Sequence, residues 1–226
     1  SMEYSYQFSE ELQQEWAWTE RYATQPEILK YAEHVVERFG LGDDIQFETR
    51  VTSTVFNDEN SSWVVQLDSA QTVVAKFVVM ATGCLSVPNF PSIDGLDNFK
   101  GPVYHTGLWP HEGVDFKDKK VAVIGTGSSA IQSSPIIAAD AQTVTIFQRT
   151  PNYSIPARNA ALDPSYVDDI KARYSSYRDE NWQRGFGADF RDNEQSALSV
   201  SNEERLAEYE DRWARGGLAF LAAYSD

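Results

Sequence analysis

Residues 119–132 read Lys-Lys-Val-Ala-Val-Ile-Gly-Thr-Gly-Ser-Ser-Ala-Ile-Gln, and this stretch decides the fold. The continuous apolar run at 121–124 predicts a strand buried on both faces, as in a parallel sheet. The G-x-G-x-x-A pattern after it predicts a strand-to-helix turn that binds a dinucleotide. Gly125 permits the tight turn, Gly127 lets the backbone approach a pyrophosphate, and Ala130 keeps the helix close to the sheet. The free N–H groups at the start of the helix would hold the phosphates.

A second strand is predicted at 143–148, Thr-Val-Thr-Ile-Phe-Gln, which completes a βαβ unit. Many nicotinamide and flavin sites place a carboxylate about 20 residues after the glycines, where it binds the ribose 2′-hydroxyl. This sequence has Gln148, Arg149 and Thr150 there. No carboxylate repels a 2′-phosphate, and Arg149 can pair with one, so the unit favours NADP over NAD or FAD. The alternative is a glycine turn in an ordinary α/β domain, with Arg149 solvated.

The composition is that of a globular protein. The 226 residues, 42% hydrophobic and 13% aromatic, can bury a core as one large domain or two small ones. The net charge of −15 argues against nucleic acid or an anionic membrane surface as a partner. No apolar stretch approaches the roughly 18–20 residues that span a bilayer, and the sequence shows no secretory signal.

The cysteine and histidine content points to a reducing compartment and no metal centre. Cys84 is the single cysteine, which excludes an internal disulfide and suits the cytoplasm. Its preferred interpretation is a small buried apolar group. The three isolated histidines add no metal-ligand cluster.

The N-terminal region predicts one long helix after an aromatic segment. Residues 3–24 are rich in Tyr, Phe and Trp, and either form a surface that something covers or a satellite hydrophobic cluster. Thr24 is a candidate cap for the helix, with Glu27 three residues after it. Gly40 is the predicted end of that helix.

A strand meander is predicted next, with strands at 45–51, 53–56, 63–67 and 73–80. The last part, Phe77–Met80, is apolar throughout and predicts a buried parallel strand that opens onto Ala81-Thr82-Gly83. A parallel strand needs neighbours, yet nothing earlier in the sequence supplies a first βαβ unit. No G-x-G-x-x-G occurs before residue 40.

The Pro- and Gly-rich connection at 84–118 contains the motif that identifies a family. Residues 99–110 read Phe-Lys-Gly-Pro-Val-Tyr-His-Thr-Gly-Leu-Trp-Pro. This resembles the fingerprint F-x-G-x-x-x-H-x-x-x-W-P of type I Baeyer–Villiger monooxygenases at every defined position, including His105 and Trp109. The resemblance extends over essentially the whole chain, with matching stretches at 4–11, 81–88, 125–132, 147–151 and 155–159. Related flavin monooxygenases that oxygenate nitrogen or sulfur share the first part of the fingerprint but usually lack its Trp-Pro ending.

The resemblance implies an α/β protein with a Rossmann-like NADP-binding domain, a helical insertion and the partial second half of an FAD-binding domain. Such enzymes use NADPH, FAD and oxygen to convert ketones to esters or lactones through a flavin peroxide. The implied NADP-binding residues are Gly125, Thr126, Gly127, Ser128, Ser129, Ala130, Gln132, Arg149 and Thr150. Val51, Ala81, Thr82 and Gly83 would border FAD. His105 and Trp109 would couple the two domains by orienting the linker rather than by proton transfer; the alternative for His105 is an ordinary buried, hydrogen-bonded histidine.

The C-terminal third is predicted to be helical, with helices at 163–184 and from Ser201 to Gly216, and a loop at 185–193 between them. The resemblance divides the chain into a partial FAD domain (3–83), a linker (84–118), an NADP-binding unit (119–160) and a helical insertion (161–226). The main FAD turn and the catalytic Arg of the family have no counterpart here. We therefore expect a middle portion of such an enzyme, inactive alone, which complementing fragments could complete. The alternatives are a non-catalytic NADP(H)-binding module or a nitrogen- or sulfur-oxygenating relative.

Overall fold

The computed structural model describes residues 2–184, 187–188 and 193–225. The chain divides into two compact units, one made of residues 1–48 with 154–226 and the other of residues 49–153. The division into four parts that the sequence predicts differs from these two units and stays a prediction.

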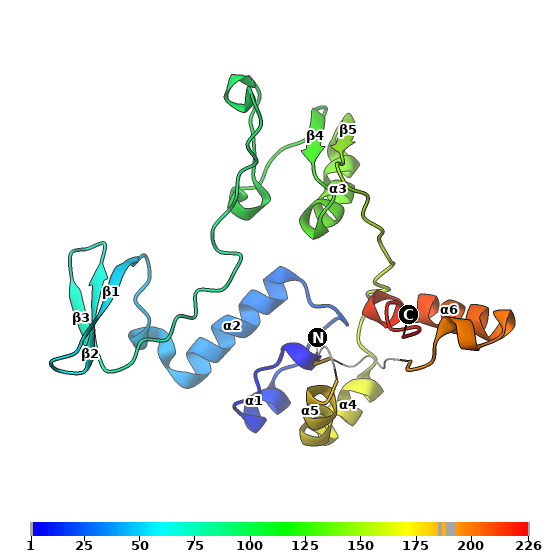
Figure 1. The fold of residues 1–226 in the computed structure, drawn as a ribbon, viewed down its shortest axis with the longest axis horizontal. Coiled ribbons are helices and arrows are strands. Elements are labelled where there is room, and N and C mark those ends of the chain that lie inside the picture. The colour runs from blue at the N-terminus through cyan, green and yellow to red at the C-terminus, as the bar shows by residue number, and fades with distance from the viewer. Residues whose placement is uncertain (1, 185–186, 189–192, 226) are drawn as a thin grey trace. The chain divides into compact units, whose positions relative to one another are not determined.

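The first unit is helical and combines the two ends of the chain. Its α-helices are α1 (Glu10–Glu15), α2 (Gln25–Phe39), α4 (Pro164–Ala172), α5 (Tyr174–Trp182) and α6 (Asn202–Arg215), which Figure 1 shows in their chain order by colour. Short 3-10 turns lie at Met2–Tyr4, Leu41–Asp44, Ala197–Ser199 and Gly217–Phe220. The predicted C-terminal helices are thus present, in three pieces rather than two.

The core of this unit joins the N-terminal segment to α4 and α5. Its buried members are Met2, Leu12, Trp18, Tyr31, Val35, Ile170, Tyr174 and Tyr177. Full burial of each large apolar side chain contributes about 1.5–3 kcal/mol. The hydrophobic-cluster interpretation of residues 3–24 is confirmed for Trp18, whereas Tyr4, Tyr6 and Phe8 are exposed.

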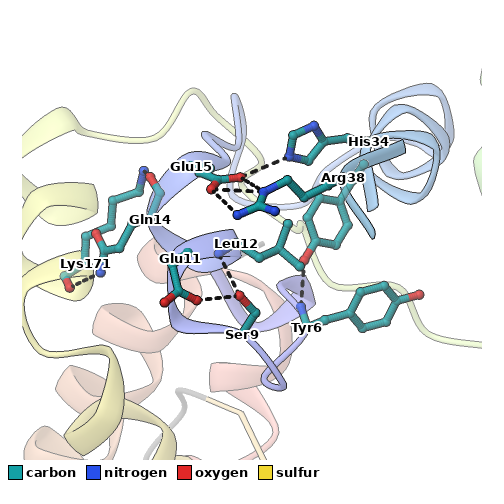
Figure 2. A network of polar contacts seen from close by, with 10 residues as sticks. Tyr6, Ser9, Glu11, Leu12, Gln14, Glu15, His34, Arg38 and Lys171 are labelled. Atoms are coloured by element: carbon teal, nitrogen blue, oxygen red, sulfur yellow. Dashed lines mark hydrogen bonds and ion pairs between the residues drawn. The ribbon is translucent and has the colours of Figure 1, made fainter. Parts of the chain in front are cut away.

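Polar contacts connect α1 with both α2 and α4, as Figure 2 shows. The Glu15 carboxylate accepts hydrogen bonds from Arg38 Nε (3.1 Å) and Nη2 (3.3 Å). Lys171 Nζ donates to the Gln14 carbonyl (2.7 Å), and Gln14 Nε2 donates to the Lys171 carbonyl (2.8 Å). These groups are exposed, so solvent weakens their contribution to stability. Their main effect is to fix the position of α1 relative to α2 and α4.

Helix ends follow the predicted capping signals with one exception. Gly40 ends α2 in the left-handed conformation (φ +62°), as predicted. Ser201 and Glu204 form a complete capping box at the start of α6. Thr24, however, makes no side-chain cap bond. Glu27 accepts instead from the Thr19 N–H (2.8 Å), which takes the carboxylate away from the predicted capping arrangement.

The helix predicted at 163–184 is interrupted at Arg173, whose φ of −131° and ψ of 30° end α4 and begin α5. Arg173 pairs there with Asp169 (2.8 Å) and Glu180 (3.7 Å), one on each helix. Most of the loop predicted at 185–193 lies outside the described residues.

The second unit contains two separate sheets. The strands β1 (Val51–Asn57), β2 (Ser62–Leu67) and β3 (Thr72–Ala75) form an antiparallel sheet in that order. The strands β4 (Lys120–Ile124) and β5 (Thr143–Phe147) pair in parallel, with α3 (Ser128–Asp140) between them in sequence (Figure 1). The predicted βαβ unit is confirmed.

Two strand predictions were wrong. Residues 45–50 form no strand, because Glu48 adopts a positive φ of +51°, which breaks the extended backbone, and β1 begins at Val51. Phe77–Met80 also forms no strand: Phe77, Val79 and Met80 are 83%, 85% and 71% exposed. No strand among the described residues pairs with this segment, and an unpaired segment cannot satisfy its backbone groups as a parallel strand does.

Two burial predictions were also wrong. The strand at 121–124 is not buried on both faces, because its sheet has two strands and Ile124 is 62% exposed. Cys84 is exposed rather than buried, since it follows the unpaired segment at 77–80.

No helix in the described part of the chain has the length and apolar character needed to cross a membrane. The same residues hold no cluster of His, Cys, Asp or Glu suited to a metal ion.

Candidate functional site

The glycine turn after β4 has the geometry that its sequence predicts. Gly125 adopts a φ of +108°, a region that favours glycine, and its N–H donates to the Phe147 carbonyl at 2.9 Å. This bond continues the β4–β5 ladder into the turn. Gly127 then serves as the N-terminal cap residue of α3.

Gly127 provides a test of whether a dinucleotide fits. Its φ of −70° suits any residue, and a Cβ placed on it would meet no protein atom within 4 Å. The fold of the chain therefore does not require glycine at this position. Open space in front of a glycine at a helix N-terminus fits the close approach of a phosphate group to the backbone.

The first turn of α3 presents backbone donors and small polar side chains. Gly127, Ser128 and Ser129 are exposed, and the first N–H groups of an α-helix have no partner within the helix. Gln132 Nε2 donates to Ser128 Oγ (2.9 Å) and to the Ser128 carbonyl (3.2 Å). The Gln132 side chain is thus held along α3 beside Ser128, with no charge to oppose a phosphate.

The parallel register places the second part of the predicted site beside the glycine turn. Ile124 pairs with Phe147, so the segments that begin at Gly125 and at Gln148 leave the same edge of the sheet. Gln148 Nε2 donates to Thr126 Oγ1 at 3.1 Å, which joins the two segments directly. Arg149 and Thr150 follow in this loop and are exposed.

One contact in this loop was missed by the sequence prediction. Asn152 Nδ2 donates to the Thr126 carbonyl at 2.8 Å and lies 3.4 Å from Thr126 Oγ1. Asn152 follows Pro151 in an irregular loop, and no periodic pattern marks it. The signal that could have found it is the amide side chain itself, which commonly binds turn backbone.

The linker motif is organised around His105. The Gly107 N–H donates to His105 Nδ1 (3.0 Å), and His105 Nε2 lies 3.3 Å from the Asn89 carbonyl. With Nδ1 as the acceptor, the tautomer that carries a proton on Nε2 lets the ring donate to the Asn89 carbonyl. The ring also lies 4.7 Å, centroid to centroid, from Phe90. His105 is half-buried and hydrogen-bonded within the linker, and its role in coupling two domains stays a prediction.

Close packing surrounds two further fingerprint positions, Gly101 and Trp109, and also Gly107, which the fingerprint leaves undefined. A Cβ on Gly101 would lie 2.7 Å from Phe99 Cε1, and one on Gly107 would lie 3.2 Å from His105 Nδ1. Trp109 packs between Tyr104 (5.9 Å) and Phe116 (6.0 Å) by ring centroids. Trp109 therefore supports the fold of the linker.

The residues predicted to border FAD lie on two separate segments of the second unit. Val51 begins β1 as the backbone partner of Leu67. Ala81, Thr82 and Gly83 are exposed and follow the unpaired segment at 77–80. No hydrogen bond in the described part of the chain links Val51 to residues 81–83. The assignment of Val51 and residues 81–83 to FAD stays a prediction.

The first unit contains an open cavity of about 500 Å³ that the sequence did not predict. Tyr4, Tyr22, Leu162, Tyr166 and Leu218 contribute its aromatic and apolar walls. Its size is in the range of small-molecule pockets, although its walls come from segments far apart in the sequence.

The chain matches the family model described as pyridine nucleotide-disulphide oxidoreductase over residues 3–210. It is 38% identical to a Baeyer–Villiger monooxygenase of Pseudooceanicola batsensis, with 95% of this chain and 39% of that protein covered. It is 35% identical to a phenazine N-monooxygenase of Lysobacter antibioticus, with 100% and 42% covered. The chain thus spans about two fifths of the length of these relatives.

Two solved structures are similar over nearly the whole chain. An oxidized steroid monooxygenase bound to NADP shares 53% identity with a TM-score of 0.91, and the match covers 100% of this chain and 43% of that one. OTEMO in complex with FAD and NADP shares 32% identity with a TM-score of 0.90, with 99% and 43% covered. These likenesses confirm the predicted α/β fold class and the resemblance carried by the linker motif.

Proposed function

Because the chain belongs to the pyridine nucleotide-disulphide oxidoreductase family, we propose that it forms the NADPH-binding part of a flavin-dependent Baeyer–Villiger monooxygenase. Such an enzyme would use NADPH, FAD and molecular oxygen to convert a ketone to an ester or lactone. The names of several relatives support this reading. A cytoplasmic location and completion by fragments that supply the remaining parts belong to the same proposal.

The observation that carries the proposal is the β4–α3–β5 unit, with Gly127 open at the helix start and Arg149 following the end of β5. Gly125, Thr126, Gly127, Ser128, Ser129, Ala130 and Gln132 would bind the pyrophosphate side of NADPH. Arg149 and Thr150 would bind the 2′-phosphate. Arg149 suits this task because its guanidinium pairs with phosphate in a bidentate way.

Bound NADPH supplies a hydride to the reaction. The residues of this chain contribute binding and orientation: donors at the start of α3 hold the phosphates, and the loop after β5 selects the 2′-phosphate. His105 and Trp109 would position the linker and exchange no proton with substrate, because His105 uses both ring nitrogens within the linker. Val51 and residues 81–83 would contact FAD when other residues complete that site.

Titration of the 226-residue chain with NADPH and NADH, together with its absorbance in the flavin band, tests this proposal. We expect NADPH to bind more tightly than NADH. A yellow sample would mean that FAD is held as well. A colourless sample that binds NADPH would favour the alternative of a non-catalytic NADP(H)-binding module. A sample that binds neither nucleotide would contradict both functions.

Nitrogen oxygenation is the second candidate activity, because a phenazine N-monooxygenase is 35% identical over the full chain. The Trp109-Pro110 ending of the linker motif favours the ketone reaction. Product analysis of the FAD-containing enzyme with a cyclic ketone and with a phenazine separates the two: lactone without N-oxide supports the first, and N-oxide without lactone supports the second.

A further inference from the structure

Thr126, the residue between the two glycines, is held by two side chains from the loop after β5. Gln148 Nε2 donates to the Thr126 hydroxyl at 3.1 Å, and Asn152 Nδ2 donates to the Thr126 carbonyl at 2.8 Å. The contact of Asn152 with the carbonyl is the more informative one, because it constrains a backbone group. It fixes the plane of the peptide that links Thr126 to Gly127.

The orientation of that peptide decides where the Gly127 N–H points. All described peptide bonds are trans, and in a trans peptide the carbonyl and the N–H point in opposite directions. Since the Thr126 carbonyl faces Asn152, the Gly127 N–H faces away from the loop after β5. No hydrogen bond among the described residues engages this N–H.

The Gly127 N–H is therefore directed outward next to the first donors of α3. The backbone in front of Gly127 is open, since a Cβ there would meet no protein atom within 4 Å. A peptide that could rotate would lose part of its affinity for an anion, because ordering it would cost free energy on binding. A peptide fixed beforehand avoids this cost.

We propose that Asn152 is a positioning residue that presets the Gly127 N–H as a donor to the pyrophosphate of NADP(H). This inference rests on the proposed function. It assigns to the loop after β5 a second task besides recognition of the 2′-phosphate by Arg149. The two tasks are separable, because a 2′-phosphate and a pyrophosphate lie on different parts of the nucleotide.

Two ligands measured on the same variants separate these tasks. NADP⁺ carries both the pyrophosphate and the 2′-phosphate, whereas 2′-AMP carries the 2′-phosphate without a pyrophosphate. For Asn152→Leu in the 226-residue chain we expect calorimetry to show about tenfold weaker NADP⁺ binding, as for one lost hydrogen bond. Binding of 2′-AMP should stay at the wild-type level.

Asn98→Leu is the matched control, because Asn98 is exposed and makes no side-chain hydrogen bond among the described residues. It should bind both ligands as wild type does. Asn152→Ser is a second variant with a residue common in turns, and it should show the same selective loss if Asn152→Leu fails to fold.

Equal weakening of both ligands by Asn152→Ser would show general loss of structure and overturn the positioning role. Unchanged NADP⁺ binding in a folded Asn152 variant would overturn it as well. If the wild-type chain binds neither NADP⁺ nor 2′-AMP, the proposed function itself fails. Arg149→Ala is the complementary variant. It should weaken the binding of NADP⁺ and of 2′-AMP together, because both ligands carry the 2′-phosphate.

Discussion

Arg149 is the residue on which the choice between NADPH and NADH depends in the proposed site. It is exposed directly after β5, and the register of the parallel pair places this loop beside the glycine turn. We expect Arg149→Ala to weaken NADPH binding about tenfold, as for loss of a charge-assisted hydrogen bond, and to leave NADH nearly unchanged. Fluorescence titration with both nucleotides measures the difference.

Arg50→Ala is a suitable control, because Arg50 is exposed and its position precedes β1. Arg50→Ala removes one positive charge, as Arg149→Ala does. The affinities for NADPH and for NADH should therefore change only by the general electrostatic effect of one charge. Equal weakening of NADPH and NADH by Arg149→Ala would contradict recognition of the 2′-phosphate.

His105 holds the linker through a ring nitrogen that accepts from the Gly107 N–H. His105→Ala removes this acceptor, so we expect the Gly107 amide to exchange with solvent about two- to tenfold faster, in keeping with the loss of one hydrogen bond. NMR hydrogen exchange measures the rate at this amide. His111→Ala removes an exposed histidine of the same linker and should leave the rate unchanged. Equal acceleration by both variants would mean that the contact does not order the linker.

At the scale of elements, Ile170 joins α4 to the core of the first unit. Its side chain is 0% exposed, whereas Ile136 in α3 is 74% exposed. We expect Ile170→Ala to lower the free energy of unfolding of this unit by about 2–5 kcal/mol, because it leaves a cavity. Ile136→Ala should change it far less. Urea unfolding followed by the helical circular dichroism signal reports mainly on the first unit, which holds five of the six described α-helices. Equal effects of the two variants would contradict the assigned core.

The capping box of α6 makes a pH-dependent contribution to stability. Backbone and side-chain hydrogen bonds from Ser201 hold the pKa of Glu204 below its ordinary value of 4.5. Because the folded pKa is the lower one, the contribution is complete above pH 4.5 and is lost as the pH falls through the folded pKa.

Glu204→Gln keeps an acceptor but does not titrate, so its stability should fall less steeply below pH 4.5 than that of wild type. Thermal unfolding followed by circular dichroism across this range measures the slope. Glu203→Gln, at the neighbouring exposed carboxylate, should retain the wild-type slope. If Glu204→Gln and wild type show the same slope, the capping carboxylate does not contribute to the acid sensitivity.

At the scale of the whole molecule, the second unit exposes apolar side chains that its own sheets do not cover. Phe77, Val79 and Met80 are examples, and large exposed apolar surface favours association. We expect Val79→Lys to reduce concentration-dependent self-association of the chain, as measured by sedimentation velocity. Ser69→Lys adds the same charge at an exposed turn residue and should have a smaller effect. Equal reduction by both would attribute the change to net charge rather than to the apolar segment.

Local patterns predicted the elements whose partners are close in sequence. The apolar run, the two glycines and the second strand specified β4, α3 and β5, because a βαβ unit forms from one continuous segment. Gly40 and the Ser201–Glu204 pair likewise marked helix ends, since a cap is formed within one turn.

The sequence by itself determined the βαβ unit, the presence of Arg149 where many nucleotide sites carry a carboxylate, and the fingerprint around His105. Tertiary structure alone decided that Phe77–Met80 stays unpaired, that Trp18 packs with Ile170, and that Asn152 binds the Thr126 carbonyl. The physical reason is that strand pairing, burial and side-chain contacts across loops depend on which distant segment arrives beside a residue. Helix caps, glycine turns and periodic apolar faces depend on neighbours that the sequence already specifies.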